Sequence, residues 1–138
     1  MAGETSLVKL LADPKPKLLP GEYVFCSLPS LEYGERADLK PIASYQEDEG
    51  LSLLLEKHKA DEAGFQYHYV LRGITLSVNS SIEAVGFTAE ISRKLAEFGI
   101  PANVVAAHHH DHIFVPTDQA ETALKLLKGE AGIQSIVR

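Results

Sequence analysis

The 138-residue chain has no tryptophan, one methionine and a single cysteine, Cys26. One cysteine cannot form a disulfide within the chain, so a disulfide-stapled fold is excluded. No run of apolar residues exceeds four, whereas a membrane-spanning helix needs about 20. The Leu-rich N-terminal stretch is interrupted by lysines and lacks both a secretory apolar region and the arginines of an import sequence. We therefore expect a cytoplasmic protein with no membrane partner.

Basic clusters and catalytic motifs are also missing. The chain has 13 Lys and Arg against 19 Asp and Glu, a formal net charge of −6, and no run of basic residues. A phosphate backbone would be repelled, so we expect no nucleic-acid partner. The sequence lacks the phosphate-binding, dinucleotide-binding, serine-hydrolase and zinc-protease motifs. We therefore expect no cofactor and no catalytic residues.

Apolar periodicity is clearest in the second half of the chain. Residues 73–78 alternate between apolar and polar side chains, which predicts a half-buried strand. Residues 87–98 carry apolar side chains at helical spacing, and Gly99 follows at the position of a helix C-cap. Two short apolar runs, 102–107 and 113–115, predict a hairpin.

A second helix and a last strand complete this half. Asp118 and Glu121 are expected to cap a helix that ends at Gly129, and residues 133–137 are expected to form the last strand. The order β-α-β-β-α-β over residues 71–138 is that of a ferredoxin-like unit, which places the chain in the α+β class. Such a unit leaves one face of its sheet uncovered by helices.

The first half is less regular and is expected to be an abbreviated copy of the same unit. Its expected elements are a helix capped by Thr5, strands over 23–28, 42–46, 51–56 and 66–71, and helical turns over 59–64. A loop over 29–41 stands where a first helix would be, and the N-terminal helix is expected to cover the vacant place. We therefore expect two parts, residues 1–70 and residues 71–138.

Residues 84–105 contain a more specific pattern. Gly86 and Phe87 stand at the strand-to-helix turn, the helix ends in Leu95-Ala96-Glu97-Phe98-Gly99-Ile100, and a short strand follows. This pattern resembles the ACT domain, and it is most similar to the regulatory domains of aspartate kinases. With Leu19–Leu28, the whole chain also resembles short bacterial proteins of two ACT-like halves. The resemblance implies a ferredoxin-like ACT domain with a second, abbreviated ACT-like half.

The resemblance also implies a function and a ligand site. ACT domains are typically regulatory and bind a free amino acid between two such domains, so we expect a non-catalytic, allosteric binding protein that forms a homodimer or higher oligomer. Gly86 would let the backbone approach the ligand, and the amides of the helix N-terminus would bind its carboxylate. The residues carried over from the family are Val85, Gly86, Phe87, Thr88, Pro101, Ala102 and Asn103.

Two positions depart from the family pattern. Pro101 removes a backbone donor, and Asn103 stands where lysine-sensing members often have an acid. A neutral amide cannot compensate the charge of a desolvated cation, so the expected ligand is a neutral amino acid.

The run His108-His109-His110-Asp111-His112 offers an alternative. Imidazoles and a carboxylate can bind zinc, nickel or copper, and alternate histidines share one face of an extended chain. A hairpin turn within the run, formed by Asp111, would break that arrangement. Cys26 lies in an apolar strand and is expected to be buried rather than nucleophilic. A metal-dependent enzyme and a structural module without ligand therefore stay open as alternatives.

Overall fold

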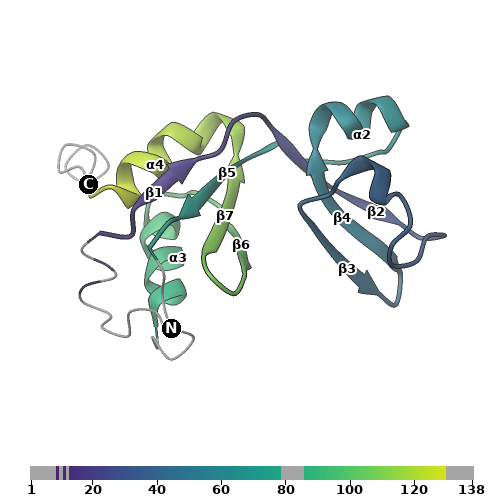
Figure 1. Ribbon diagram of the computed structural model, residues 1–138. Coiled ribbons are helices and arrows are strands. Elements are labelled where there is room, and N and C mark those ends of the chain that lie inside the picture. The colour runs from purple at the N-terminus through teal and green to yellow at the C-terminus, as the bar shows by residue number, and fades with distance from the viewer. Residues whose placement is uncertain (1–8, 10, 12, 79–85, 130–138) are drawn as a thin grey trace. The chain divides into compact units, whose positions relative to one another are not determined.

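The computed structural model describes residues 9, 11, 13–78 and 86–129 of the chain (Figure 1). The chain folds into two compact units: unit 1 contains residues 1–20 and 72–138, and unit 2 contains residues 21–71. None of the helices in the described ranges has the length and apolar character needed to cross a membrane.

The elements of unit 1 are β1 (Pro16–Leu18), β5 (Leu71–Leu76), α3 (Phe87–Glu97), β6 (Asn103–Ala106), β7 (Asp111–Pro116), a 3-10 turn (Thr117–Gln119) and α4 (Ala120–Leu127). Those of unit 2 are β2 (Tyr23–Leu28), a 3-10 turn (Ala37–Leu39), β3 (Ala43–Glu47), β4 (Gly50–Glu56) and α2 (Lys57–Ala63).

Within the described residues, unit 1 has four strands and the helices α3 and α4, which pack on the sheet. The order of these strands is β1-β5-β7-β6, so β6 is the outer strand of those described. The helices pack on the sheet through one apolar core, which includes Ile74 and Ile113 from the strands, Leu95 from α3 and Leu126 from α4. This arrangement confirms the α+β class and the ferredoxin-like strand order.

The strand beside β5 comes from an unexpected part of the chain. Residues 133–137, expected there as the last strand, lie outside the described residues. The position is taken by β1, which pairs antiparallel with β5 in the register Pro16–Leu76, Lys17–Thr75 and Leu18–Ile74. Leu11, which is helical, also packs against the core of unit 1, although the N-terminal helix was expected to cover the other half.

Unit 2 is the smaller sheet with a single α-helix. Its strands have the order β3-β4-β2, and Leu71 pairs with Tyr23 on the other side of β2. Val24, Cys26 and Leu53 face α2 and pack with Ala60 in the core of this unit. The loop between β2 and β3 contains one 3-10 turn where unit 1 has α3, as expected for an abbreviated copy.

Three local expectations are wrong. Residues 66–70 do not form a strand, and the extended segment begins only at Leu71. The helix after β7 is not capped by Asp118, because α4 begins after a 3-10 turn and has no side-chain cap hydrogen bond. Residues 16–18, which are not among the strands expected from the sequence, form β1. The division into two ACT-like parts, residues 1–70 and 71–138, stays a prediction, while packing groups residues 1–20 with residues 72–138 in unit 1.

Gly50 is predicted to be the least replaceable glycine of unit 2. Its φ is +136°, and a Cβ there would lie 2.5 Å from the Cα of Pro29 and 2.6 Å from the carbonyl oxygen of Leu28. Gly50→Ala should lower the free energy of unfolding by about 2–4 kcal/mol, since backbone atoms must move. Gly34→Ala is the control: φ is +92° but nothing lies within 4 Å, so only the backbone cost of about 1 kcal/mol applies. Equal losses in urea denaturation would contradict the steric account.

Candidate functional site

The turn that starts α3 carries the first of the two segments that the sequence predicts to bind a ligand. Gly86 is the N-cap residue with a φ of 91°, a conformation that glycine adopts without strain. The Glu90 N–H donates to the Gly86 carbonyl oxygen at 2.9 Å, which is the first bond of the helix. The amides of residues 87–89 therefore have no acceptor within the helix, and the helix dipole adds positive potential beside them.

The predicted side chains at this turn differ in their availability. Phe87 is 3% exposed and belongs to the apolar core of unit 1, so only its backbone N–H is offered to a ligand. Thr88 is exposed, whereas Val85 lies outside the described residues. The available groups are thus the Gly86 backbone, the first amides of α3 and the Thr88 hydroxyl.

The second predicted segment lies at the other end of α3. Pro101 and Asn103 are exposed, and Ala102 packs partly buried against the core. This segment follows the C-terminal end of α3, where the Ile100 N–H donates to the Leu95 carbonyl oxygen. An 11-residue helix is about 16 Å long, which separates Gly86 from residues 101–103.

The register of the sheet gives the same result. Asn103 pairs with Phe114 of β7, whose ring lies against Gly73 near the start of β5. The opposite end of the sheet holds the end of β5 and the β6–β7 hairpin, where His110 Nδ1 lies 3.4 Å from the Val78 carbonyl oxygen. Within one unit, the structure does not bring the two predicted segments together.

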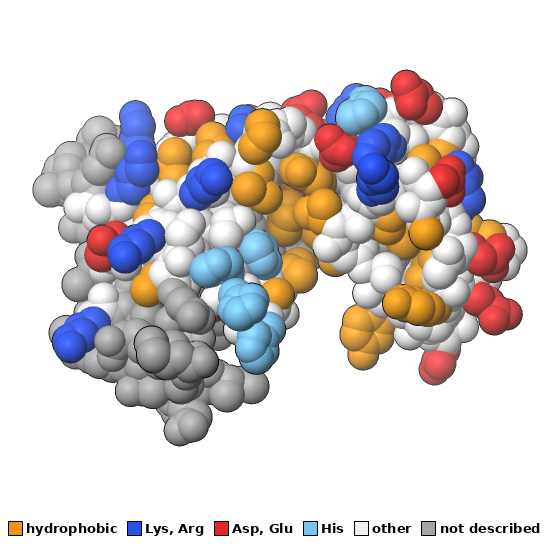
Figure 2. Space-filling model, in the orientation of Figure 1, with side chains coloured by type: hydrophobic (Ala, Val, Ile, Leu, Met, Phe, Trp, Pro, Cys, Tyr) orange, Lys and Arg blue, Asp and Glu red, His pale blue; other side chains and the backbone are white. Residues whose placement is uncertain are grey.

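The β6–β7 hairpin carries the histidine run, and Figure 2 shows the histidine side chains gathered on one face. The Ala107 N–H donates to the His110 carbonyl oxygen, so the turn spans residues 107–110. The rings of His108 and His109 meet edge to face with centroids 4.8 Å apart, and both residues are exposed. His112 lies further along β7 and contacts β5, because its Nδ1 lies 3.0 Å from the Thr75 hydroxyl.

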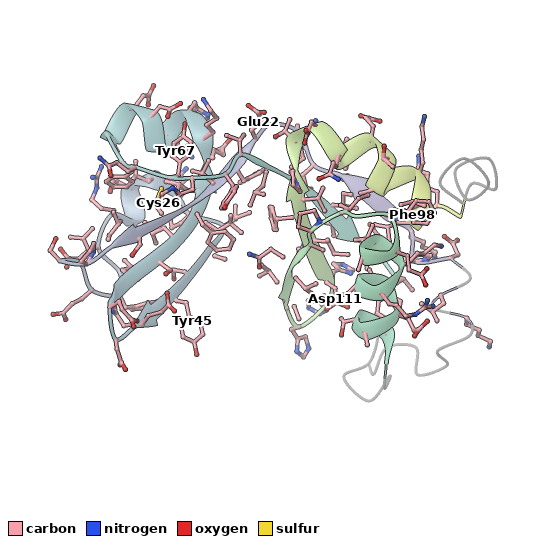
Figure 3. The ribbon with its side chains drawn as sticks, turned by 180° about the vertical axis from the view of Figure 1, so that it is seen from behind. Glu22, Cys26, Tyr45, Tyr67, Phe98 and Asp111 are labelled. Carbon is pink, nitrogen blue, oxygen red and sulfur yellow. The ribbon has the colours of Figure 1, made fainter. Side chains whose placement is uncertain are left out.

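The sequence suggested that Asp111 forms the turn, and this expectation is wrong. Asp111 begins β7 opposite Ala106 (Figure 3). It is 8% exposed, and burial raises the pKa of its carboxyl group, an effect that His112 and His110 partly offset. Burial lowers the pKa of His112, and the charge of His110 lowers it further, while Asp111 acts in the opposite direction. The lowered pKa means that the surroundings of His112, at the start of β7, favour the uncharged imidazole.

The described residues give no support to the metal and thiol alternatives. Among them, no three His, Cys, Asp or Glu side chains are arranged to hold a metal ion. Cys26 is 2% exposed in the core of unit 2, and burial, with a smaller contribution from Asp61, raises the pKa of its thiol. A raised pKa keeps this thiol protonated, which is the opposite of an activated nucleophile.

Comparison with known proteins agrees with this fold. One ACT-domain family profile matches residues 2–72 and a second matches residues 71–129. A crystal structure from Vibrio cholerae, described as a protein of unknown function and possible transport protein, is 46% identical with a TM-score of 0.81. The alignment covers 88% of this chain and 93% of that one. No protein of curated function matches the chain.

Two more distant structures resemble the chain in fold alone. The ligand-free regulatory subunit of aspartate kinase from Thermus thermophilus is 13% identical with a TM-score of 0.61, over 84% of this chain and 95% of that one. Aspartokinase III of E. coli, in complex with aspartate and ADP, is 18% identical with a TM-score of 0.58. That alignment covers 85% of this chain and 33% of the kinase.

The half-buried His112 predicts a pH-dependent stability. Its pKa in the folded protein lies below the ordinary value of 6.5, so the unfolded chain binds the proton more readily. The contribution of His112 to the free energy of unfolding should be largest above pH 6.5 and should decrease as the pH falls through the interval between 6.5 and the lower folded-state pKa. Urea denaturation between about pH 7.5 and 5.5 measures this slope. His112→Gln should flatten it, whereas His108→Gln, which removes an exposed histidine of the same hairpin, should not.

Proposed function

The chain belongs to the ACT-domain family, and we propose on that premise that it is a non-catalytic regulatory module that binds a free amino acid. The observation that carries this proposal is the start of α3. There Gly86 adopts a left-handed conformation and leaves the first amides of an 11-residue helix facing the turn. ACT domains are typically regulatory and bind small ligands, and both halves of this chain match the family.

The proposed ligand binds through its carboxylate. A carboxylate accepts hydrogen bonds from the amides of residues 87–89 and is favoured by the positive end of the α3 dipole. The Thr88 hydroxyl, which is exposed, supplies a further donor. The buried Phe87 side chain anchors the turn to the core of unit 1 and keeps these donors in place.

A second copy of the chain is needed to complete the proposed site. Because residues 101–103 lie about one helix length from the Gly86 turn, one unit cannot offer both segments to one amino acid. A second copy can place its Asn103 against the side chain of the bound amino acid. β6, which begins at Asn103, is the outer strand among those that the structure describes, and an outer strand can pair with another chain. The proposed state is therefore a homodimer or a higher oligomer.

Regulation then follows from differential affinity. An amino acid that binds between two copies stabilises the assembly in which the turn and residues 101–103 meet. The free energy by which the ligand can influence a separate partner equals the difference between its binding free energies for the assembly in which the segments meet and for the one in which they do not. The proposed protein is thus a sensor that acts on another protein.

Gly86 is expected to be essential for ligand binding. A thermal-shift screen against the twenty amino acids should find a ligand that adds about 2.7 kcal/mol of stability at 100 times its Kd. Gly86→Val should abolish this stabilisation, since a branched side chain blocks the approach to the amides and disfavours positive φ. Gly99→Val introduces the same strain at the other end of α3, where φ is +72° and nothing lies within 4 Å. If Gly86→Val retains binding, the site lies elsewhere; if Gly99→Val loses binding to the same extent, the loss reflects strain in α3 rather than the blocked turn.

Asn103 is expected to set the charge preference of the ligand. The unaltered protein should prefer neutral amino acids over lysine and arginine, because an amide cannot compensate a desolvated cation. Asn103→Asp should gain affinity for lysine by about 1–3 kcal/mol through a charge-assisted hydrogen bond. Isothermal titration calorimetry with lysine and with the ligand from the screen measures both preferences. An unchanged ranking of ligands in the variant would remove Asn103 from the site.

A further inference from the structure

Asp111 is the only buried residue with a charged side chain among those that the structure describes, and it is 8% exposed. Moving a carboxylate out of water costs free energy unless a hydrogen bond or an opposite charge compensates it. A buried carboxylate therefore points either to a partner within the fold or to a group that binds to it.

No such partner is found for Asp111 in the described part of the chain. None of the lysines or arginines there forms an ion pair with it, and none of the hydrogen-bond donors there reaches its carboxylate. The charged groups nearby are the imidazoles of His110 and His112. Both rings are directed at β5, because His110 Nδ1 lies 3.4 Å from the Val78 carbonyl oxygen and His112 Nδ1 lies 3.0 Å from the Thr75 hydroxyl.

The register of the sheet places Asp111 at the end where β5 leads toward α3. β5 and β7 are neighbours and run antiparallel, because Phe114 lies against Gly73 and His112 lies beside Thr75, further along β5. Asp111 is the first residue of β7, so it lies next to the end of β5. Figure 1 shows the β6–β7 hairpin at the same end of the sheet as the start of α3.

The carboxylate also faces the layer of helices. Side chains alternate along a strand, so Asp111 lies on the same face as Ile113 and Val115, which pack in the core with α3 and α4. Phe87, the first residue of α3, packs in that core too. The Asp111 carboxylate and the amides of residues 87–89 thus lie on the same face and at the same end of the sheet of unit 1.

We propose that Asp111 binds the ammonium group of the amino acid whose carboxylate is bound at the start of α3. This role depends on the function proposed above, in which the carboxylate and the side chain of the ligand have binding groups but its ammonium group has none. An ammonium group supplies the charge-assisted hydrogen bonds that Asp111 lacks. A carboxylic acid without an amino group would leave Asp111 buried and unpaired, so the ligand is an α-amino acid with a free amino group.

The experiment compares amino acids with their des-amino analogues, such as valine with 3-methylbutanoate, by NMR of the full-length, isotope-labelled protein. The twenty amino acids are added singly, and those that shift the amides of residues 87–89 are titrated to saturation beside their analogues. The unaltered protein should bind the amino acid at least about tenfold more tightly than the analogue, the ratio expected for one charge-assisted hydrogen bond. The carboxyl carbon signal of Asp111 should report a lower pKa in the complex, because a nearby cation favours the charged form.

Asp111→Asn removes the charge with little change in shape. It should weaken the amino acid about tenfold and change the affinity of the analogue by less than about twofold, so the preference for the ammonium group disappears. Asp118→Asn is the matched control, because Asp118 is exposed and stands in the 3-10 turn that follows the other end of β7. The control should change neither affinity.

Equal weakening of both ligands by Asp111→Asn would show that Asp111 has a structural role and would overturn the proposal. So would a pKa of Asp111 that is the same in the free protein and in the complex, a result that needs no variant. If residues 87–89 respond to an amino acid while Asp111 does not, the amino-acid site stands and only the role of Asp111 fails. If none of the twenty amino acids shifts residues 87–89, both proposals fail.

Discussion

The pairing of β1 with β5 determines how the whole chain is arranged. Residues 16–18 fill the strand position beside β5, and the contact continues beyond them, because the Leu19 N–H donates to the Gly73 carbonyl oxygen and Arg72 donates to the Leu19 carbonyl oxygen. Pro16 is tolerated because β1 is an outer strand of the sheet as far as the chain is described. Unit 1 is therefore discontinuous in sequence, and unit 2 is inserted between its first and second strands.

Local patterns in the sequence predicted most elements but not this pairing. The alternation of residues 23–28 and the apolar spacing of residues 87–97 follow from burial on one face, and both elements were expected at nearly these bounds. A three-residue strand among prolines and lysines has no period to detect. Its partner, β5, is distant in sequence. Only the lack of a strand beside β5 in the predicted sheet could have indicated that a further strand pairs there.

Of the two segments of the candidate site, the sequence predicts the Gly86 turn correctly as a helix start, but it does not predict that residues 101–103 lie at the opposite end of the sheet. A glycine before an amphipathic helix identifies the Gly86 turn, and the structure gives it the left-handed conformation of an N-cap. Spacing along the chain does not show at which end of α3 a segment lies, and residues 101–103 follow the far end. The histidine run was expected to be a hairpin, while the burial of Asp111 depends on packing that the sequence does not display. The close approach of Gly50 to Leu28 and Pro29 in unit 2 is likewise a tertiary contact that the sequence does not display.

The insertion of unit 2 has a consequence for the order of events during synthesis. Lys17 leaves the ribosome 58 residues before its partner Thr75, and every strand and helix of unit 2 is made in that interval. Unit 2 has all its strand partners once Leu71 is made, whereas the sheet of unit 1 must wait for β5 and β7. Until β5 is made, β1 therefore has no partner strand among the described elements, and the sheet of unit 1 can close only when these first residues are brought back to the later ones.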